Sequence, residues 1–179
     1  MKRNIWIFGG IAGLIVAAFM VVSSALCYHS GTFEGSMLLG YAGMLLAFSF
    51  VFVGIKNYRD QYNNGMVTFV QGLKIGGLIT LIGATVYVVV WLFDFYLFIP
   101  DFMEKYIAHT IIQAKANGAT PAELNEQIAD MAWYREKYKN PIWVILLTYA
   151  EILPVGIVVT LVSALILKRN TPKPEAVIA

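Results

Sequence analysis

The chain has 179 residues, of which 59% are hydrophobic and only 13% are charged, and its mean hydropathy is +0.68. A soluble domain needs more polar surface than this, so the composition excludes an ordinary globular protein and favours an integral membrane protein. The single cysteine, Cys27, excludes an intramolecular disulfide. A formal net charge of +2 gives no reason to expect nucleic-acid binding.

Four apolar segments reach the length of about 20 residues that a helix needs to cross a bilayer. They are residues 5–26, 37–55, 75–99 and 142–167. The first segment follows two basic residues, as in a signal peptide, but its apolar run exceeds the usual length of about 7–15 residues. We therefore expect it to be a retained span. The prediction is an all-α, polytopic membrane protein with one four-span domain over residues 1–179.

The segment between the third and fourth spans, residues 101–140, is predicted to form a helical hairpin. "NG" at 117 and 118 breaks a helical pattern of apolar residues. Thr120, Pro121 and Glu123 are then typical of a new helix with a capping box. "NP" at 140 and 141 ends that helix and begins the last span.

Lysine and arginine predict the orientation, because they concentrate on the cytoplasmic side of membrane proteins. Eight of them alternate onto one side: Lys2, Arg3, Lys56, Arg59, Lys74, Lys168, Arg169 and Lys173. The hairpin carries five more and is the weak point of this pattern. We expect both termini in the cytoplasm and an extracytoplasmic hairpin. In a bacterium with two membranes the location would be the inner membrane, because outer-membrane proteins are barrels.

Two groups of residues in or beside the spans have alternative interpretations. Gly9 and Gly13, and likewise Gly72 and Gly76, have the spacing of small residues at close helix contacts. They form either a dimer seam or ordinary packing within one bundle. A second group binds an anionic lipid headgroup or serves only as a cytoplasmic anchor: Lys56, Arg59 and Lys74.

The stretch from residue 54 to 93 resembles a family of small Bacteroidetes membrane proteins, domain of unknown function 4199. The residues that carry the resemblance are Gly54, Lys56, Tyr58, Arg59, Asp60, Gly65, Thr68, Phe69, Gly72 and Gly76. The order of two spans, this motif, a third span, a long loop and a last span also fits. The resemblance implies an integral membrane protein and supplies no activity, substrate or catalytic residue.

Glu151 is the residue most suggestive of chemistry, because the stretch from Ile142 to Leu167 contains no other charge. At 1.5 Å per residue it lies about 14 Å into the span, near the middle of the bilayer. A charged group there costs about 2.5–3.5 kcal/mol, and holding the carboxyl protonated at neutral pH costs about 3.7 kcal/mol. Since the two costs are similar, a local partner must decide the charge state. Glu151 is either an ion or proton site or a structural residue.

Pro154 and Asp94 bear on the same hypothesis. Pro154 lacks an N–H, so the carbonyl of Ala150 loses its helical donor beside Glu151, and we expect a kink there. Broken helices with ionisable residues often mark ion sites in carriers. Asp94, near the outer end of the third span, is either a second member of such a site or a carboxylate facing the headgroups.

The sequence offers little support for a metal site, a cofactor or an enzyme. The candidate ligands are Cys27, His29, Glu34, Asp101 and His109, and none has a recognised ligand spacing. No nucleophile elbow, phosphate loop, HExxH motif or nucleotide fingerprint is present. We therefore expect no metal, no cofactor and no enzymatic activity.

Two functions remain. The first, which the sequence favours, is a non-enzymatic membrane scaffold or accessory subunit, with a homodimer or another membrane protein as its partner beside the lipid bilayer. The second is a small ion- or proton-coupled carrier that uses Glu151.

Overall fold

The computed structural model describes residues 1–30 and 36–170, without the side chains of residues 36–38. In these residues the chain is all-helical apart from its turns and one isolated bridge. The helices are α1 (Lys2–Ser30), α2 (Ser36–Asn57), α3 (Phe69–Phe93), α4 (Phe102–Ala116), α5 (Pro121–Tyr138) and α6 (Pro141–Leu167). Two short π-helical segments, η1 (Tyr58–Tyr62) and η2 (Asp94–Phe98), continue α2 and α3.

Within the described residues, four helices are long and apolar enough to cross a membrane. They are α1, α2, α3 and α6, in the places where the sequence predicts spans, so the prediction of an all-α protein with four such helices is confirmed. The third begins at Phe69, earlier than the predicted 75. Thr68 caps it and forms a reciprocal capping box with Gln71, so the residues before Ile75 belong to one continuous helix.

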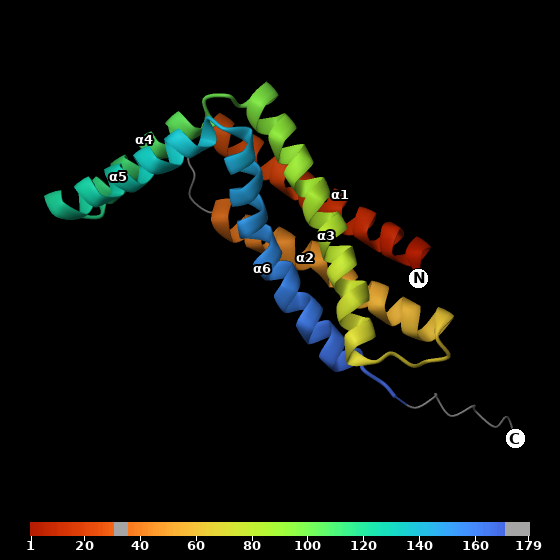
Figure 1. Ribbon diagram of the computed structural model, residues 1–179. Coiled ribbons are helices and arrows are strands. Elements are labelled where there is room, and N and C mark those ends of the chain that lie inside the picture. Colours follow the sequence, from red (N-terminus) through yellow and green to blue (C-terminus); the bar gives the residue numbers. More distant parts are fainter. Residues whose placement is uncertain (31–35, 171–179) are drawn as a thin grey trace, which may run out of the picture.

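These four helices form a bundle, and α4 and α5 lie side by side as a hairpin that projects from one end of it (Figure 1). Both termini of the described bundle lie at the opposite end, where Val67 and Arg169 exchange two backbone hydrogen bonds. The predicted capping box between Thr120 and Glu123 is present. Gly118, in the hairpin turn, has φ +79°, a left-handed conformation that glycine adopts without strain.

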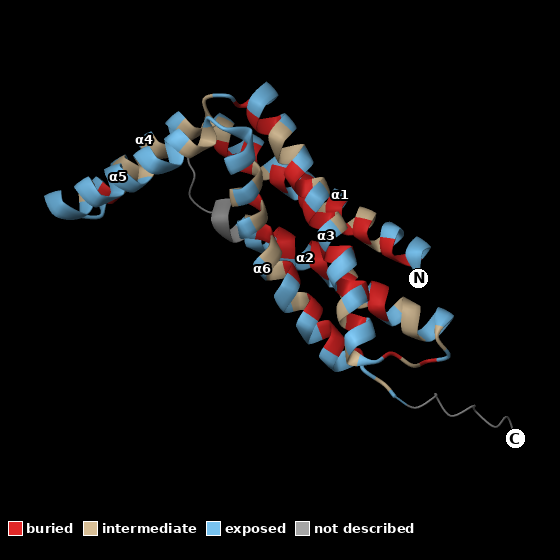
Figure 2. Ribbon diagram, viewed as in Figure 1, coloured by how far each residue is buried: buried red, intermediate tan, exposed pale blue. Residues whose placement is uncertain are grey.

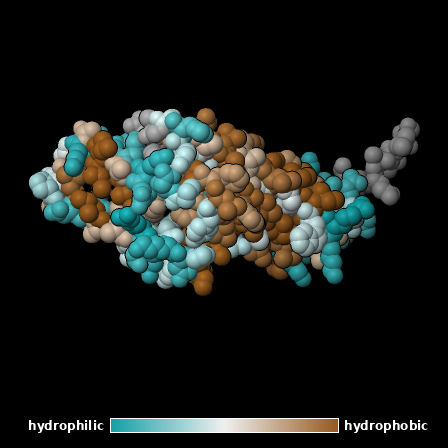
Figure 3. Space-filling model, turned by 90° about the horizontal axis from the view of Figure 1, so that it is seen from above, coloured by the Kyte–Doolittle hydropathy of each residue, from teal (hydrophilic) through white to brown (hydrophobic). Residues whose placement is uncertain are grey.

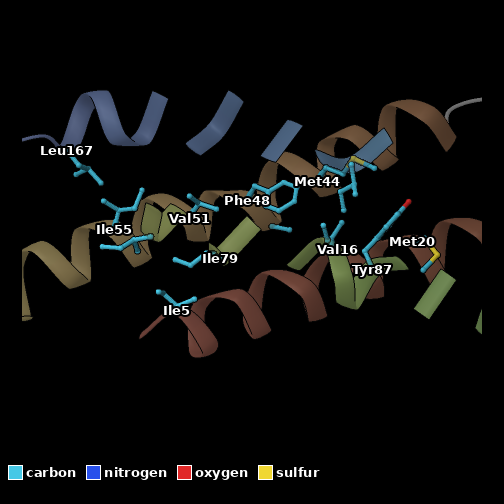
Figure 4. Packing of buried hydrophobic residues seen from close by; sticks show 14 of the residues in the cluster. Ile5, Val16, Met20, Met44, Phe48, Val51, Ile55, Ile79, Tyr87 and Leu167 are labelled. Atoms are coloured by element: carbon cyan, nitrogen blue, oxygen red, sulfur yellow. The ribbon is translucent and has the colours of Figure 1, made fainter. Parts of the chain in front are cut away.

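The core runs along the length of the bundle. Its side chains form a row from Ile55 and Leu167 at one end to Met20 and Tyr87 at the other (Figure 4). Phe48, in the middle of α2, is completely buried. The hairpin contributes little to this core, because α5 has no buried residue and α4 has only Ala114.

The outward faces of the bundle helices are exposed and apolar. Figure 2 shows exposed residues along these faces, and Figure 3 shows a broad hydrophobic surface around the middle of the molecule. Leu14 and Ile166, for example, are 67% and 65% exposed. A soluble monomer rarely shows so large an apolar surface, whereas the hydrocarbon of a bilayer solvates it.

The glycines of α1 lie against α3. A Cβ added at Gly9 would come within 2.8 Å of Ile82, and one added at Gly13 within 2.7 Å of Val86. Real Cβ atoms do not approach this closely, so the two backbones can meet here only because both residues lack a side chain. These glycines are used inside the bundle and not on an outer face.

The glycines of α3 lie against α6 in the same way. A Cβ at Gly72 would lie 3.0 Å from that of Ala164, and one at Gly76 would lie 2.8 Å from the Thr160 side chain. The Thr80 and Thr160 hydroxyls share a hydrogen bond of 3.0 Å one turn further along. The contact between α3 and α6 thus combines close approach with a buried polar pair.

Gly76 and Gly77 provide a test of this packing, because they are adjacent in α3 but Gly76 is buried and Gly77 is exposed. Gly76→Ala should lower the stability of the protein by about 1–3 kcal/mol, since the added methyl overfills the contact with Thr160. A Cβ added at Gly77 would meet no described atom within 4 Å, so Gly77→Ala should be neutral or stabilising by about 0.5–1 kcal/mol. Thermal unfolding in detergent measures both. Equal effects would mean that α3 and α6 do not approach as described.

Candidate functional site

A cavity of about 610 Å³ lies where the hairpin meets the bundle. Each of the helices α1 to α6 contributes to its lining. Aromatic rings and methionines make up most of the wall, including Phe19, Met20, Tyr41, Met44, Tyr87, Trp91, Phe102, Tyr138 and Met131. The polar lining includes Ser23, Ser24, His109, Gln113, Thr148 and Glu151. A concave, mainly apolar site of this size with a few polar groups is typical of small-molecule binding.

Glu151 brings its carboxylate to this cavity from α6. It lies ten residues after Pro141, the first residue of the helix, which is about 15 Å along the axis. The side chain is exposed to the open space that residues of α1 to α6 line. In the described part of the chain, the carboxylate has no hydrogen-bond or ion-pair partner. No described neighbour therefore fixes its charge state.

The polar neighbours of Glu151 along α6 have partners of their own. The Thr148 hydroxyl donates to the Val144 carbonyl at 2.7 Å. The Tyr149 hydroxyl shares a 2.9 Å hydrogen bond with Thr85 on an exposed face. α6 continues as a helix across Pro154, whose missing N–H leaves the Ala150 carbonyl without its usual donor.

Tyr87 and Tyr138 approach Glu151 from α3 and α5. Tyr87 is 7% exposed and lies at the end of the core row. Burial, and to a lesser degree the nearby carboxyl group of Glu151, raises the pKa of Tyr138 to about 12. The Tyr138 phenol therefore keeps its proton at physiological pH, so it is a hydrogen-bond donor next to the cavity.

Asp94 is not among the residues that line the cavity with Glu151. Its carboxylate is buried, with only 8% of the residue exposed, and accepts a 2.7 Å hydrogen bond from the Ser24 hydroxyl of α1. Ser24 lines the cavity, whereas Asp94 does not. Asp94 therefore lies inside the protein and does not face the headgroups. The structure pairs Asp94 with Ser24, and no described contact joins it to Glu151.

Ser23 is a cavity residue that sequence reasoning missed. Its Oγ is buried and has no hydrogen-bond partner among the described residues. An unpaired buried hydroxyl is costly, so a polar group or water in the cavity would stabilise it. Nothing in the sequence near Ser23 distinguishes it from other small residues of the first span.

The predicted lipid-headgroup residues lie at the other end of the bundle. Arg59 forms an ion pair with Asp60 at 2.7 Å, and its Nη1 donates to the Leu167 carbonyl at 3.5 Å. Lys56 and Lys74 are exposed. Arg59 therefore holds η1 against the end of α6, and the two lysines keep their ammonium groups at the surface.

The candidate metal ligands do not converge. Among the described residues, no group of three or more His, Cys, Asp and Glu side chains could hold a metal ion, and Glu34 lies outside those residues. Asp101 instead accepts a 2.6 Å hydrogen bond from Tyr28 and pairs with Lys105 at 3.1 Å. The Tyr28 hydrogen bond, more than the lysine, lowers the pKa of Asp101. Cys27 is a buried free cysteine.

Aromatic contacts join the hairpin to the bundle. Trp91 meets Phe102 edge-on with ring centres 5.5 Å apart, and Phe95 meets Tyr138 at 5.4 Å. At the start of α6, the ring centre of Trp143 lies 6.4 Å from that of Trp133 in α5. These contacts position α4 and α5 over the cavity.

The adjacent serines of α1 provide a matched test. Ser24→Ala removes the only described partner of the buried Asp94 carboxylate and should destabilise the protein by about 1–3 kcal/mol. Ser23→Ala removes a hydroxyl that has no described partner and should leave stability unchanged or raise it slightly. Thermal unfolding in the same detergent compares them. A larger loss for Ser23→Ala would contradict the bonding seen here.

Comparison with curated proteins and with solved structures finds no match for this chain. A family model described as "protein of unknown function (DUF4199)" matches residues 7–169, which include the four apolar helices almost entirely. The resemblance noted in the segment from 54 to 93 thus extends over nearly the whole sequence. The chain belongs to this family of proteins of unknown function.

Proposed function

We propose that this multi-pass membrane protein binds a small ligand in the cavity and uses Glu151 as the ion- or proton-exchanging group of a carrier. The observation that supports the proposal is a carboxylate without a described partner, about halfway along a membrane helix, that opens into a 610 Å³ cavity. Ionisable residues at this depth are functional by default, because they are costly to keep.

The energetics favour exchange over a fixed charge. In the bilayer the charged and the protonated carboxyl cost similar amounts, about 2.5–3.5 and 3.7 kcal/mol. A buried arginine or lysine would decide the balance, but the described cavity lining contains neither. A proton and a positively charged ligand can then compete for the same carboxylate, which is the elementary requirement for coupling one to the other.

A scaffold or accessory subunit is the second candidate. The hairpin supports it, because α4 and α5 lie outside the bundle and still expose large apolar side chains that a partner could cover. Ile112 and Trp133 are 66% and 46% exposed. The glycines at 9, 13, 72 and 76 no longer support it, because they are occupied within the chain. The scaffold explains the exposed hairpin and leaves the cavity without a role. Four spans are few for a carrier, so the leading proposal includes self-association.

We further propose that the protein lies in the inner membrane of a two-membrane bacterium, with both termini in the cytoplasm and the hairpin outside. The distribution of positive charge supports this orientation. The start of α1, the end of α2, the start of α3 and the end of α6 lie at the end of the bundle opposite the hairpin (Figure 1). Lys2, Lys56, Lys74 and Arg169 belong to these helix ends or stand next to them in the sequence. The positive-inside rule assigns that end to the cytoplasm.

Labelling with a hydrophobic carbodiimide in native-like membranes tests the role of Glu151. The reagent modifies protonated carboxyls in apolar sites, so labelling should fall as the pH rises and Glu151 loses its proton. Intact mass and peptide mapping measure the modification. Glu151→Gln should abolish it, and Asp94→Asn should leave it, because Asp94 is buried behind Ser24. Labelling that is absent, or the same at every pH, would make Glu151 structural and favour the scaffold.

Single cysteines test the orientation in a Cys27→Ser background. Asn117, in the hairpin turn, and Asn170, after α6, are both exposed. A membrane-impermeant maleimide should label Asn117→Cys in intact spheroplasts and Asn170→Cys only after lysis. Gel shift or mass spectrometry reads the result. The reverse pattern would place the hairpin in the cytoplasm.

A further inference from the structure

We infer that the ligand of this cavity is a lipophilic organic cation: a positively charged group on an aromatic or alkyl body. The inference rests on the proposed function, since it takes Glu151 as a cavity carboxylate that is available for binding. It adds the chemical class of the ligand. Three observations support that class: the charge of the lining, its aromatic content and its volume.

The charge of the lining favours a cation. Glu151 is the only carboxylate among the described lining residues, and neither lysine nor arginine is present to neutralise it. His109 is the one basic group among the lining residues that the structure describes, and it has an interaction of its own. An anionic ligand would meet the carboxylate with no arginine or lysine to offset the repulsion. A cation would satisfy the carboxylate in a site of low dielectric constant, where the attraction is strong.

The aromatic content favours an organic cation over a metal ion. Rings from several helices line the cavity: Phe19 of α1, Tyr41 of α2, Tyr87 and Trp91 of α3, and Tyr138 of α5. Ring faces attract ammonium-type cations, and they attract them most where water is excluded. A calcium ion, by contrast, needs about 6–8 oxygen ligands, which one carboxylate and scattered hydroxyls do not supply.

The volume fits a body of several rings or chains. The cavity measures about 610 Å³, in the middle of the range of roughly 300–1,000 Å³ that drug-sized ligands occupy. Met20, Met44 and Met131 contribute flexible side chains to the wall, and methionine adapts to ligands of different shape. We therefore expect a class of compounds to bind, and not one molecule.

Binding should weaken as the pH falls, because a proton and the cation compete for Glu151. The titratable groups that face Glu151 are Tyr41 of α2, Tyr87 of α3, Tyr106 and His109 of α4, and Tyr134 and Tyr138 of α5, while α1 contributes the hydroxyls of Ser23 and Ser24. Protonation of His109 would add a positive charge and oppose the cation in the same direction. The Glu151→Gln variant separates the two contributions.

Tetraphenylphosphonium and tetraphenylborate are suitable probes, because they have nearly the same shape and opposite charge. Equilibrium dialysis with the full chain in lipid nanodiscs, against empty nanodiscs, measures both. The wild type should bind the cation and show no binding of the anion above the lipid background. Glu151→Gln should bind the cation at least about tenfold more weakly, while Glu151→Asp, which keeps the charge, should retain most of the affinity.

Tyr41 tests the aromatic contribution at a position that tolerates change, since it is 45% exposed and outside the core. Tyr41→Phe should bind the cation as the wild type does, and Tyr41→Leu several-fold more weakly. Thermal unfolding confirms that each variant is folded before binding is compared.

The outcomes separate this inference from the proposed function. Equal binding of cation and anion, or equal binding by the wild type and Glu151→Gln, would overturn the organic-cation assignment. So would cation binding in detergent that disappears in nanodiscs, because lipid would then be the occupant. If the carbodiimide still labels Glu151 in a pH-dependent way, the exchange function stands with another ligand. If that labelling also fails, both are wrong.

Discussion

Close contact between α3 and its neighbours is the constraint on which the bundle depends. Helices in lipid gain nothing from burying apolar surface against each other, so they associate where small residues allow backbone approach and polar groups can pair. α3 meets this requirement on two sides, with Gly9 and Gly13 of α1 facing one side and its own Gly72 and Gly76 facing α6. The buried hydrogen bond between Thr80 and Thr160 adds a polar interaction to the contact between α3 and α6.

The cavity begins where this small-residue pattern ends. Along α3 the buried positions advance from Gly72 through Gly76 and Thr80 to Gly83, and the next positions at the same helical spacing are Tyr87 and Trp91. Rings at these positions cannot permit the close approach that glycine allows, so the helices leave space between them. The same replacement supplies the aromatic wall that faces Glu151. The change from small to aromatic residues along α3 thus explains why the bundle is closely packed around Gly72 and Gly76 and why it contains a cavity beside Tyr87 and Trp91.

Features that depend on local sequence could be predicted, and those that depend on several helices could not. The spans follow from length and hydropathy, and the start of α5 follows from Thr120, Pro121 and Glu123, because capping involves neighbouring residues. Glu151 can also be recognised from local sequence, because it is the only charged residue between Ile142 and Leu167. The partnership of Ser24 with Asp94 joins residues 70 positions apart, and Ser23, which has no partner among the described residues, is marked by nothing in the sequence around it. The cavity needs all of α1 to α6, so no single segment indicates it.

The cavity is built across two parts of unequal packing. The bundle side is supported by the core and by the glycine contacts, whereas the hairpin side comes from α4 and α5, which bury almost nothing of their own. Elements with few buried apolar contacts open at lower free energy than a core does. The hairpin is held by ring contacts such as Trp91–Phe102 and by the Tyr28–Asp101 hydrogen bond. The depth of the cavity around Glu151 therefore depends on the hairpin, whose two helices bury only Ala114 between them.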